Sequence, residues 1–128
     1  MKRFGLIGKT LDHSFSKTFF KEFFEKNNLN AEYKNYPLEN IEEVQSIFDI
    51  DQLVGLNVTI PYKESVIPFL DKISPEAKEI GAVNVVKVIN GEKIGFNTDA
   101  YGFHQSIKPF LTNKHERALI LGTGGASK

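Results

Sequence analysis

Apolar residues in the first third of the chain alternate between short strand-like runs and one helical stripe. Residues 3–8 form a short apolar run that ends in glycine, and this run predicts a strand. Five phenylalanines then recur at helical spacing, which predicts a helix over about residues 16–28. The stripe consists of Phe15, Phe19 and Phe23, widened by Phe20 and Phe24. Residues 31–38 predict a second strand, with Pro37 at its end.

A helix, a strand and a second, shorter helix are predicted next. The pattern from Asn40 to Glu43 resembles a capping box at the start of a helix. The apolar face of that helix comprises Ile41, Val44, Ile47 and Phe48. Residues 54–60 predict a third strand, which Pro61 stops because proline lacks a backbone donor. A short helix is expected to follow through Val66.

The following segment predicts a helical turn and then a β-hairpin. Ser74 is typical of a helix N-cap, and Gly81 is typical of the residue that closes a helix. Residues 82–89 are rich in β-branched types. Asn90–Gly91 is the strongest two-residue hairpin signal in the chain, and the second strand of the predicted hairpin returns through residues 94–96.

The end of the chain predicts one more helix and one more strand. The helix extends from residue 99 to about residue 111. Its apolar face carries Phe103, Ile107, Phe110 and Leu111. After a polar linker at residues 113–116, residues 117–121 predict a buried strand that leads into glycine-rich residues 122–126.

Strands that alternate with helices indicate an α/β protein. We expect an open three-layer α/β/α domain with a mainly parallel sheet plus a β-hairpin. Ligands of such sheets bind in the crevice beyond the carboxyl ends of the strands. Three polar clusters fall at those ends, namely residues 13–16, 57–63 and 97–99. Their shared location is the first indication of a binding site.

Composition refines this picture mainly by excluding partners. The 128 residues have a formal net charge of zero, whereas nucleic acids and anionic membranes attract proteins with a basic surplus, so neither is expected as a partner. The absence of cysteine excludes disulfides and thiolate ligands and is compatible with a cytoplasmic location. The three histidines lack the spacing of a metal site, so no metal is expected. The apolar run near Met1 is too short for a signal peptide or a membrane span.

Ser14 and Ser16 lie where a loop becomes a helix. A helix N-terminus offers free backbone N–H groups and a partial positive charge, so two hydroxyls there can help to hold a carboxylate or a phosphate. The alternative is that one of the serines is only an N-cap.

Asn57 and Thr59 alternate along a strand and therefore point to the same face. Lys63 follows the proline that ends this strand, so its ammonium can reach back over the strand end. A lysine beside a cleft can act as a general acid or base, or it can pair with a carboxylate. The alternative is a solvated surface lysine.

Asn84 and Asp99 are two further candidates. Asn84 interrupts an apolar run, and a buried asparagine needs hydrogen-bond partners, so it either contributes to the site or only fixes a turn. Asp99 begins a predicted helix, where it is either a simple N-cap or a carboxylate that orients Lys63 and binds a ligand hydroxyl.

These motifs together resemble the shikimate dehydrogenase family along the whole chain. The family has a serine-x-serine loop, a glycine-x-asparagine-valine-threonine-x-proline-x-lysine stretch, a glycine-alanine-valine-asparagine motif, an asparagine-threonine-aspartate motif and a nucleotide-binding glycine loop. The corresponding residues, in the same order, are 14–16, 55–63, 81–84, 97–99 and 122–127. The first loop departs from the family pattern, because Thr10, Leu11 and Lys17 replace its usual proline, isoleucine and proline.

The resemblance implies one whole domain followed by part of a second domain. Residues 1–112 correspond to the family's substrate-binding domain. Residues 113–128 correspond to the linker, first strand and glycine-rich loop of a truncated NADP-binding Rossmann domain. We therefore expect residues 1–128 alone to bind no NADP and to show no turnover. We expect the strand at residues 117–121 to be disordered, to fold back, or to pair with a second copy in a homodimer.

The resemblance also implies an activity, the NADP-dependent reversible reduction of 3-dehydroshikimate to shikimate. Lys63 would be the general acid/base, and Asp99 would hold it and bind a neighbouring hydroxyl. Ser14 and Ser16 would bind the ring carboxylate. The remaining substrate-binding residues would be Asn57, Thr59 and Asn84. The residues expected to bind NADP are Gly122, Gly124, Gly125 and Ala126.

Three alternatives stay open at this point. A quinate-oxidising or NAD-using relative would carry the same substrate motifs. A non-catalytic domain that binds a small hydroxy acid would not need to keep both Lys63 and Asp99. A relative of the same fold with another carbonyl or folate substrate would lack the serine-x-serine loop.

Overall fold

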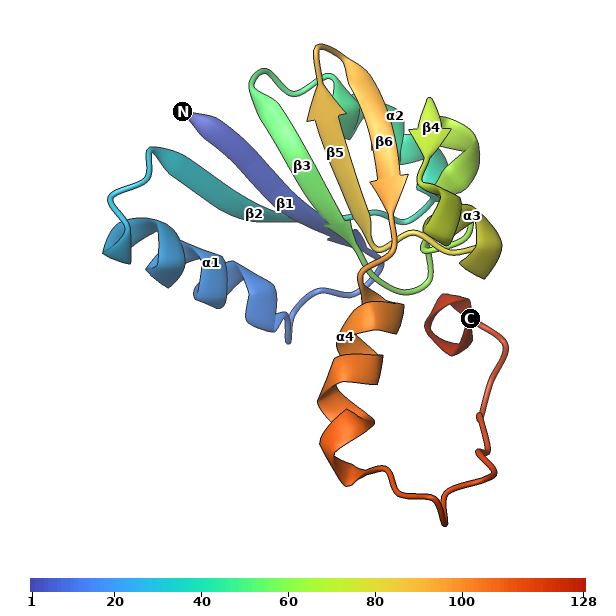
Figure 1. The fold of residues 1–128 in the computed structure, drawn as a ribbon. Coiled ribbons are helices and arrows are strands. Elements are labelled where there is room, and N and C mark those ends of the chain that lie inside the picture. The colour runs from blue at the N-terminus through green and yellow to red at the C-terminus, as the bar shows by residue number, and fades with distance from the viewer.

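The computed structural model describes all residues, 1–128, and its centre is a single six-stranded sheet (Figure 1). The strands are β1 (Lys2–Gly8), β2 (Ala31–Pro37), β3 (Leu53–Val58), β4 (Lys72–Ile73), β5 (Val85–Ile89) and β6 (Glu92–Phe96). Their order across the sheet is β2-β1-β3-β5-β6-β4. β1 pairs in parallel with both β2 and β3, and β4 pairs in parallel with β6, whereas β5 is antiparallel to β3 and β6. The predicted open, mainly parallel sheet is confirmed.

The predicted hairpin joins β5 to β6. Asn90 and Gly91 have φ angles of 51° and 78°. Both values lie in the left-handed region that the two central residues of a type I′ turn require, and this turn matches the twist of paired strands. The Asn-Gly pair therefore sets the register in which Ile89 lies opposite Glu92.

Helices cover both faces of the sheet (Figure 1). The helices are α1 (Phe15–Lys26), α2 (Val44–Phe48), α3 (Pro75–Ile80) and α4 (Asp99–Ile107), with short 3₁₀ turns at Ile41–Glu43, Ile67–Phe69, Lys108–Phe110 and Gly125–Ser127. Neighbouring residues of β1 point to opposite faces, so Leu6 joins a small cluster under α1 whereas Ile7 joins the main core. Val44 of α2 and Ala77 of α3 pack into that main core. None of the helices combines the length and apolar character needed to cross a membrane.

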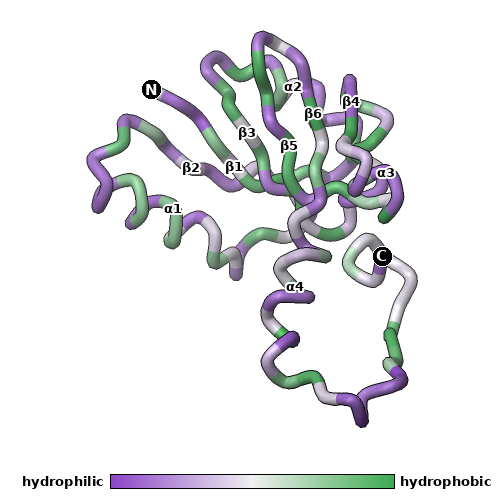
Figure 2. Tube along the Cα trace, in the orientation of Figure 1, coloured by the Kyte–Doolittle hydropathy of each residue, from purple (hydrophilic) through white to green (hydrophobic).

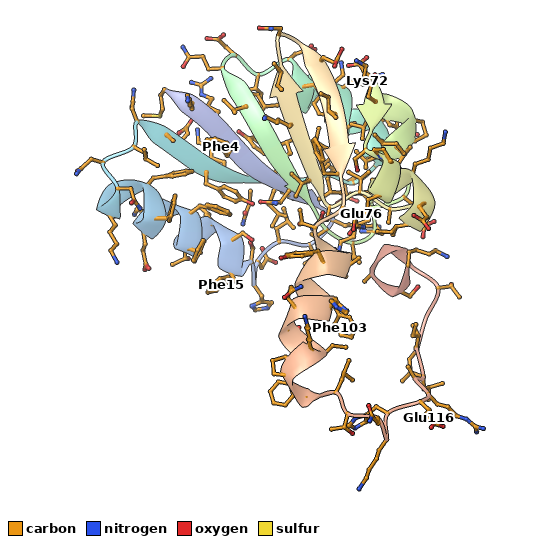
Figure 3. The ribbon with its side chains drawn as sticks, in the orientation of Figure 1. Phe4, Phe15, Lys72, Glu76, Phe103 and Glu116 are labelled. Atoms are coloured by element: carbon orange, nitrogen blue, oxygen red, sulfur yellow. The ribbon has the colours of Figure 1, made fainter.

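The inward face of α1 differs from the expected stripe. Phe24 is buried and Phe20 is partly buried, and both pack toward the sheet. Phe15, Phe19 and Phe23 are exposed, and their rings contact one another along the outer side of the helix. The side chain of Phe15 lies near the start of α1 in Figure 3. Spacing alone could not choose the face, because both sets of phenylalanines repeat every four residues.

Between β3 and α3, one local prediction is wrong and one strand was missed. Residues 63–66 form turns instead of a helix, and a 3₁₀ turn follows at Ile67–Phe69. Pro68 within that turn has no backbone donor to continue an α-helix. β4 was not expected, because a strand of two residues shows no periodicity.

The predicted strand at residues 117–121 is also wrong. These residues have no regular structure, and Leu119 and Leu121 are 85% and 87% exposed. A strand needs a neighbour to satisfy its backbone groups, and no other strand lies beside this segment. Most of the segment is hydrophobic in Figure 2, and the chain loops away from α4 before its end returns toward the sheet. Self-association through residues 117–121 stays a prediction.

A substitution at Gly95 should destabilise the domain. A methyl group at Gly95 would lie 2.6 Å from Leu70 Cδ1 and 2.9 Å from Val83 Cγ2, so the packed side chains would have to move. Gly95→Ala should lower the free energy of unfolding by about 1–3 kcal/mol, as overpacking does in other cores. Urea denaturation monitored by circular dichroism measures this change.

Gly102→Ala is the matched control. Gly102 lies within α4 and has no atom within 4 Å of the added methyl group. Because alanine favours a helix interior over glycine, this variant should be neutral or more stable by up to about 1 kcal/mol. Equal changes in the free energy of unfolding for the two variants would contradict the close packing around Gly95 on β6.

Candidate functional site

One pocket gathers all seven of the residues that the sequence suggested for substrate binding. Its volume is about 510 Å³. Its lining residues come from the ends of β1 and β3 and from the starts of α1 and α4, and Figure 1 shows where these elements lie. The seven predicted residues that line it are Ser14, Ser16, Asn57, Thr59, Lys63, Asn84 and Asp99. His13 lines it as well. The role of each residue stays a prediction, but their meeting in one pocket is a property of the fold.

Lys63 and Asp99 form the only ion pair in this pocket. Lys63 Nζ lies 2.6 Å from Asp99 Oδ2. The lysine side chain is only 14% exposed, whereas that of the aspartate is 48% exposed. The backbone of Lys63 is anchored as well, because its carbonyl accepts a hydrogen bond from the Val83 N–H at 2.7 Å. The ammonium group is therefore held at one point of the pocket wall, a geometry suited to proton transfer.

Asn84 holds the other oxygen of the same carboxylate. Its Nδ2 donates to Asp99 Oδ1 at 3.0 Å and to Thr98 Oγ1 at 2.8 Å. Its Oδ1 accepts from the Thr98 backbone N–H at 2.8 Å. Both amide protons are thus used inside the protein, so in this structure Asn84 orients Asp99. A direct substrate contact by Asn84 stays a prediction.

The start of α4 depends on Asn97, which sequence reasoning did not select. Asn97 is buried, with only 6% of its surface exposed. Its Nδ2 donates to the Ala82 carbonyl at 3.0 Å, and its Oδ1 accepts from the Ala100 N–H at 3.1 Å. The usable signal was an asparagine three residues before a helical N–H, which is a capping pattern. Asp99 itself lies in the first turn of α4, so it is not the N-cap.

The serine loop is arranged differently from a simple cap. Ser14 occupies the N-cap position of α1, but its side chain makes no capping hydrogen bond. Its Oγ is shielded from solvent and has no hydrogen-bond partner in the protein. A buried hydroxyl without a partner costs free energy, so this atom is suited to meet a polar group of a ligand after a small rotation. Ser16 is the second residue of the same helix and also lines the pocket.

Asn57 and Thr59 reach the pocket from the end of β3. Asn57 Oδ1 accepts a hydrogen bond from the Tyr33 hydroxyl at 2.8 Å. The Thr59 N–H donates to the Ile7 carbonyl at 2.9 Å, which ties this loop to β1. The approach is close, because a methyl group at Gly8 would lie 2.5 Å from Thr59 Cγ2. Glycine at this position therefore allows the two strand ends to meet.

A second pocket of about 720 Å³ lies on the other side of the ion pair, between α4 and the end of the chain. Lys63 and Asp99 line both pockets. Of the residues predicted to bind a dinucleotide, Gly125 and Ala126 line this second pocket, whereas Gly122 and Gly124 do not. Figure 3 shows Phe103 on α4, which contributes to the same wall.

The glycine-rich residues are not flanked by the strand and the helix that are typical of a dinucleotide site. Such a site places the pyrophosphate between a strand and the N-terminus of a helix. Here no strand precedes the glycines, and only a 3₁₀ turn at Gly125–Ser127 follows them. Gly125 lies against Lys63, since a methyl group there would be 2.5 Å from Lys63 Cβ. The NADP contacts of these glycines, and the expected lack of NADP binding by residues 1–128 alone, both stay predictions.

Comparison with known proteins identifies a family. A family model described as "Shikimate dehydrogenase substrate binding domain" matches residues 6–86. Shikimate dehydrogenase (NADP(+)) of Syntrophomonas wolfei is 44% identical over 126 residues, which are 97% of this chain and 43% of that protein. The corresponding protein of Carboxydothermus hydrogenoformans is 46% identical over 131 residues, covering 97% of this chain and 45% of that protein.

Solved structures agree with the sequence matches. Shikimate dehydrogenase 1 from Peptoclostridium difficile superposes with a TM-score of 0.90 at 42% identity, over 99% of this chain and 48% of that one. A shikimate 5-dehydrogenase from Thermus thermophilus, solved in complex with shikimate, has a TM-score of 0.86 at 36% identity, over 99% of this chain and 49% of that one. The chain thus spans about half the length of the relatives it matches.

Removing Asn97 should disturb the wall that carries Asp99. Asn97→Ala leaves the buried Ala82 carbonyl and the Ala100 N–H without their partners, so the free energy of unfolding should fall by about 1–3 kcal/mol. Asn113→Ala, at an exposed turn position, is the control and should change stability little. Urea denaturation compares the two, and an unchanged midpoint for Asn97→Ala would refute the structural role.

Proposed function

We propose that this chain, which belongs to the family of shikimate dehydrogenase substrate-binding domains, binds shikimate and 3-dehydroshikimate and carries the acid/base pair for their NADP-dependent interconversion. The observation that supports this most is the Lys63–Asp99 pair in the wall of a pocket that also holds the serine loop. Relatives that the chain matches over nearly its whole length bear the name shikimate dehydrogenase (NADP(+)).

The proton step is assigned to Lys63. In the reducing direction the carbonyl oxygen of 3-dehydroshikimate gains a proton, and the Lys63 ammonium donates it at Nζ. In the oxidising direction the amine takes the proton back from the hydroxyl oxygen. Asp99 accepts from Lys63 and Asn84 and so keeps Nζ aimed at one place. NADP would supply the hydride chemistry of the named relatives, and Gly122, Gly124, Gly125 and Ala126 would help to hold it in a protein of the relatives' length.

The carboxylate of the substrate is assigned to the start of α1. The first backbone N–H groups of this 12-residue helix have no partner within the helix, and they carry a partial positive charge. The hydroxyls of Ser14 and Ser16 lie at the same end, and that of Ser14 has no partner in the protein. A carboxylate placed here lies apart from the reacting oxygen at Lys63, so it sets the orientation of the ring.

The serine assignment predicts a loss of affinity. Shikimate titrated calorimetrically into residues 1–128 should bind weakly but saturably, and Ser14→Ala and Ser16→Ala should each weaken binding by about 0.5–3 kcal/mol. Ser46→Ala removes a hydroxyl from α2, outside the pocket, and serves as the control. If the pocket variants bind as well as Ser46→Ala does, the carboxylate lies elsewhere. Quinate titrated in parallel tests the quinate-oxidising alternative.

The acid/base assignment predicts a loss of turnover. Residues 1–128 can replace the matching part of the Syntrophomonas wolfei relative, and the chimera should oxidise shikimate with NADP⁺. In that chimera Lys63→Ala should lower kcat by about 10²–10⁴-fold, the usual contribution of a general acid/base group. Adding Asp99→Asn should cost little more, because the two side chains act as one unit.

Lys72→Ala provides the matched control for this experiment. Lys72 forms an ion pair with Glu92 on the exposed edge of the sheet, and it lines neither pocket. Its removal should leave kcat unchanged. Near wild-type kcat for Lys63→Ala in an active chimera would show that another group moves the proton.

A further inference from the structure

Tyr33 is a buried tyrosine whose hydroxyl lies behind the wall of the substrate pocket. It lies on β2 beneath α1, where its ring stacks on Phe20 with centroids 4.8 Å apart and planes inclined by 16°. It belongs to the small core cluster that also contains Leu6 and Phe24. Tyr33 is not among the residues that line the substrate pocket.

The Tyr33 hydroxyl nevertheless meets a residue that does line the pocket. It reaches across β1, which lies between β2 and β3, and donates to Asn57 Oδ1 at 2.8 Å. Burial raises the pKa of Tyr33 to about 12, partly opposed by the nearby Ser16 side chain, so the hydroxyl keeps its proton at neutral pH. A protonated phenol has one hydrogen to give, and Asn57 receives it.

This hydrogen bond decides which end of the Asn57 amide faces the pocket. An amide has an acceptor oxygen on one side and an NH₂ donor on the other. With Oδ1 directed at Tyr33, the NH₂ group is directed away from Tyr33, and it makes no hydrogen bond within the protein. The opposite orientation would present an acceptor to the ligand, which would repel a carboxylate or carbonyl oxygen.

We propose that Tyr33 is a positioning residue, which holds Asn57 so that its N–H donors face the pocket and bind an oxygen of the ligand. The proposal rests on the proposed function, because it takes the ligand to be a hydroxylated carboxylate such as shikimate. It adds a donor to the pocket wall that contains the unpartnered Ser14 hydroxyl. The ring of Tyr33 contributes to the core, whereas its hydroxyl oxygen serves the site.

Tyr33→Phe separates these two contributions, because it keeps the stacked ring and removes only the hydroxyl. The first measurement is the side-chain amide signal of Asn57 in ¹⁵N NMR spectra of the 128-residue chain without ligand. We expect the two Nδ2 proton signals to shift and to broaden as the amide gains freedom. The side-chain amide of Asn27, which donates to the Phe23 carbonyl at the far end of α1, is the internal control and should not change.

The second measurement is shikimate affinity by calorimetric titration of the same proteins. Tyr33→Phe should weaken binding about 3–10-fold, which corresponds to one ordinary hydrogen bond. In an Asn57→Ala background the same change should have no further effect, because the residue through which Tyr33 acts is already missing. Tyr36→Phe, on the same strand but with no hydrogen bond from its hydroxyl, is the matched control and should bind normally.

The outcomes separate this inference from the function on which it rests. An unchanged Asn57 amide signal in Tyr33→Phe overturns the inference, whether or not the chain binds shikimate. A changed signal with unchanged affinity, or equal losses in the presence and absence of Asn57, overturns it as well. If the wild-type chain fails to bind shikimate, the proposed function fails, while the NMR comparison still decides whether Tyr33 holds Asn57.

Discussion

The parallel pairing of β1 with β3 is the constraint on which the site depends. Leu6 lies opposite Asn57 and Ile7 opposite Val58, so the two strands end side by side. The loops that follow must then leave the sheet at the same edge, since parallel strands point the same way. One of these loops carries the serines and the other carries Lys63. Burial of Ile7 in the main core holds this register, because a shift by one residue would turn it to the other face.

The Lys63–Asp99 ion pair contributes more to geometry than to stability. Asp99 is about half exposed, and ion pairs that contact water usually stabilise a protein by only about 0–1 kcal/mol. Asn84 holds Asp99 Oδ1, and Asn97 fixes the start of α4 through the Ala82 carbonyl and the Ala100 N–H. The pair is therefore placed by the structure around it, and the lysine remains accessible from two pockets.

Asparagine side chains recur in this site for one physical reason. An amide has a donor end and an acceptor end, so a single protein partner at one end determines what the other end offers. Asn57 is held through its oxygen by Tyr33 and directs its donors outward. Asn84 uses both donors internally and fixes a carboxylate. The same residue type thus serves recognition at one position and alignment at another.

Local signals in the sequence determined much of this protein. The Asn90–Gly91 turn, the alternation of strands and helices and the order of the polar motifs depend on neighbouring residues, so they could be identified without coordinates. The strand ends then gathered the predicted polar side chains, because a parallel sheet leaves few places where such loops can meet.

Tertiary structure decided those features that the spacing of residues along the chain does not determine. Phe20 and Phe24 face the sheet although Phe15, Phe19 and Phe23 share their spacing, because only contact with β1 and β2 distinguishes the two stripes. Residues 117–121 have the composition of a strand but form none, because a strand exists only beside a partner. The link from Tyr33 to Asn57 joins residues 24 apart across an intervening strand, so no local pattern encodes it and only the packed sheet creates it.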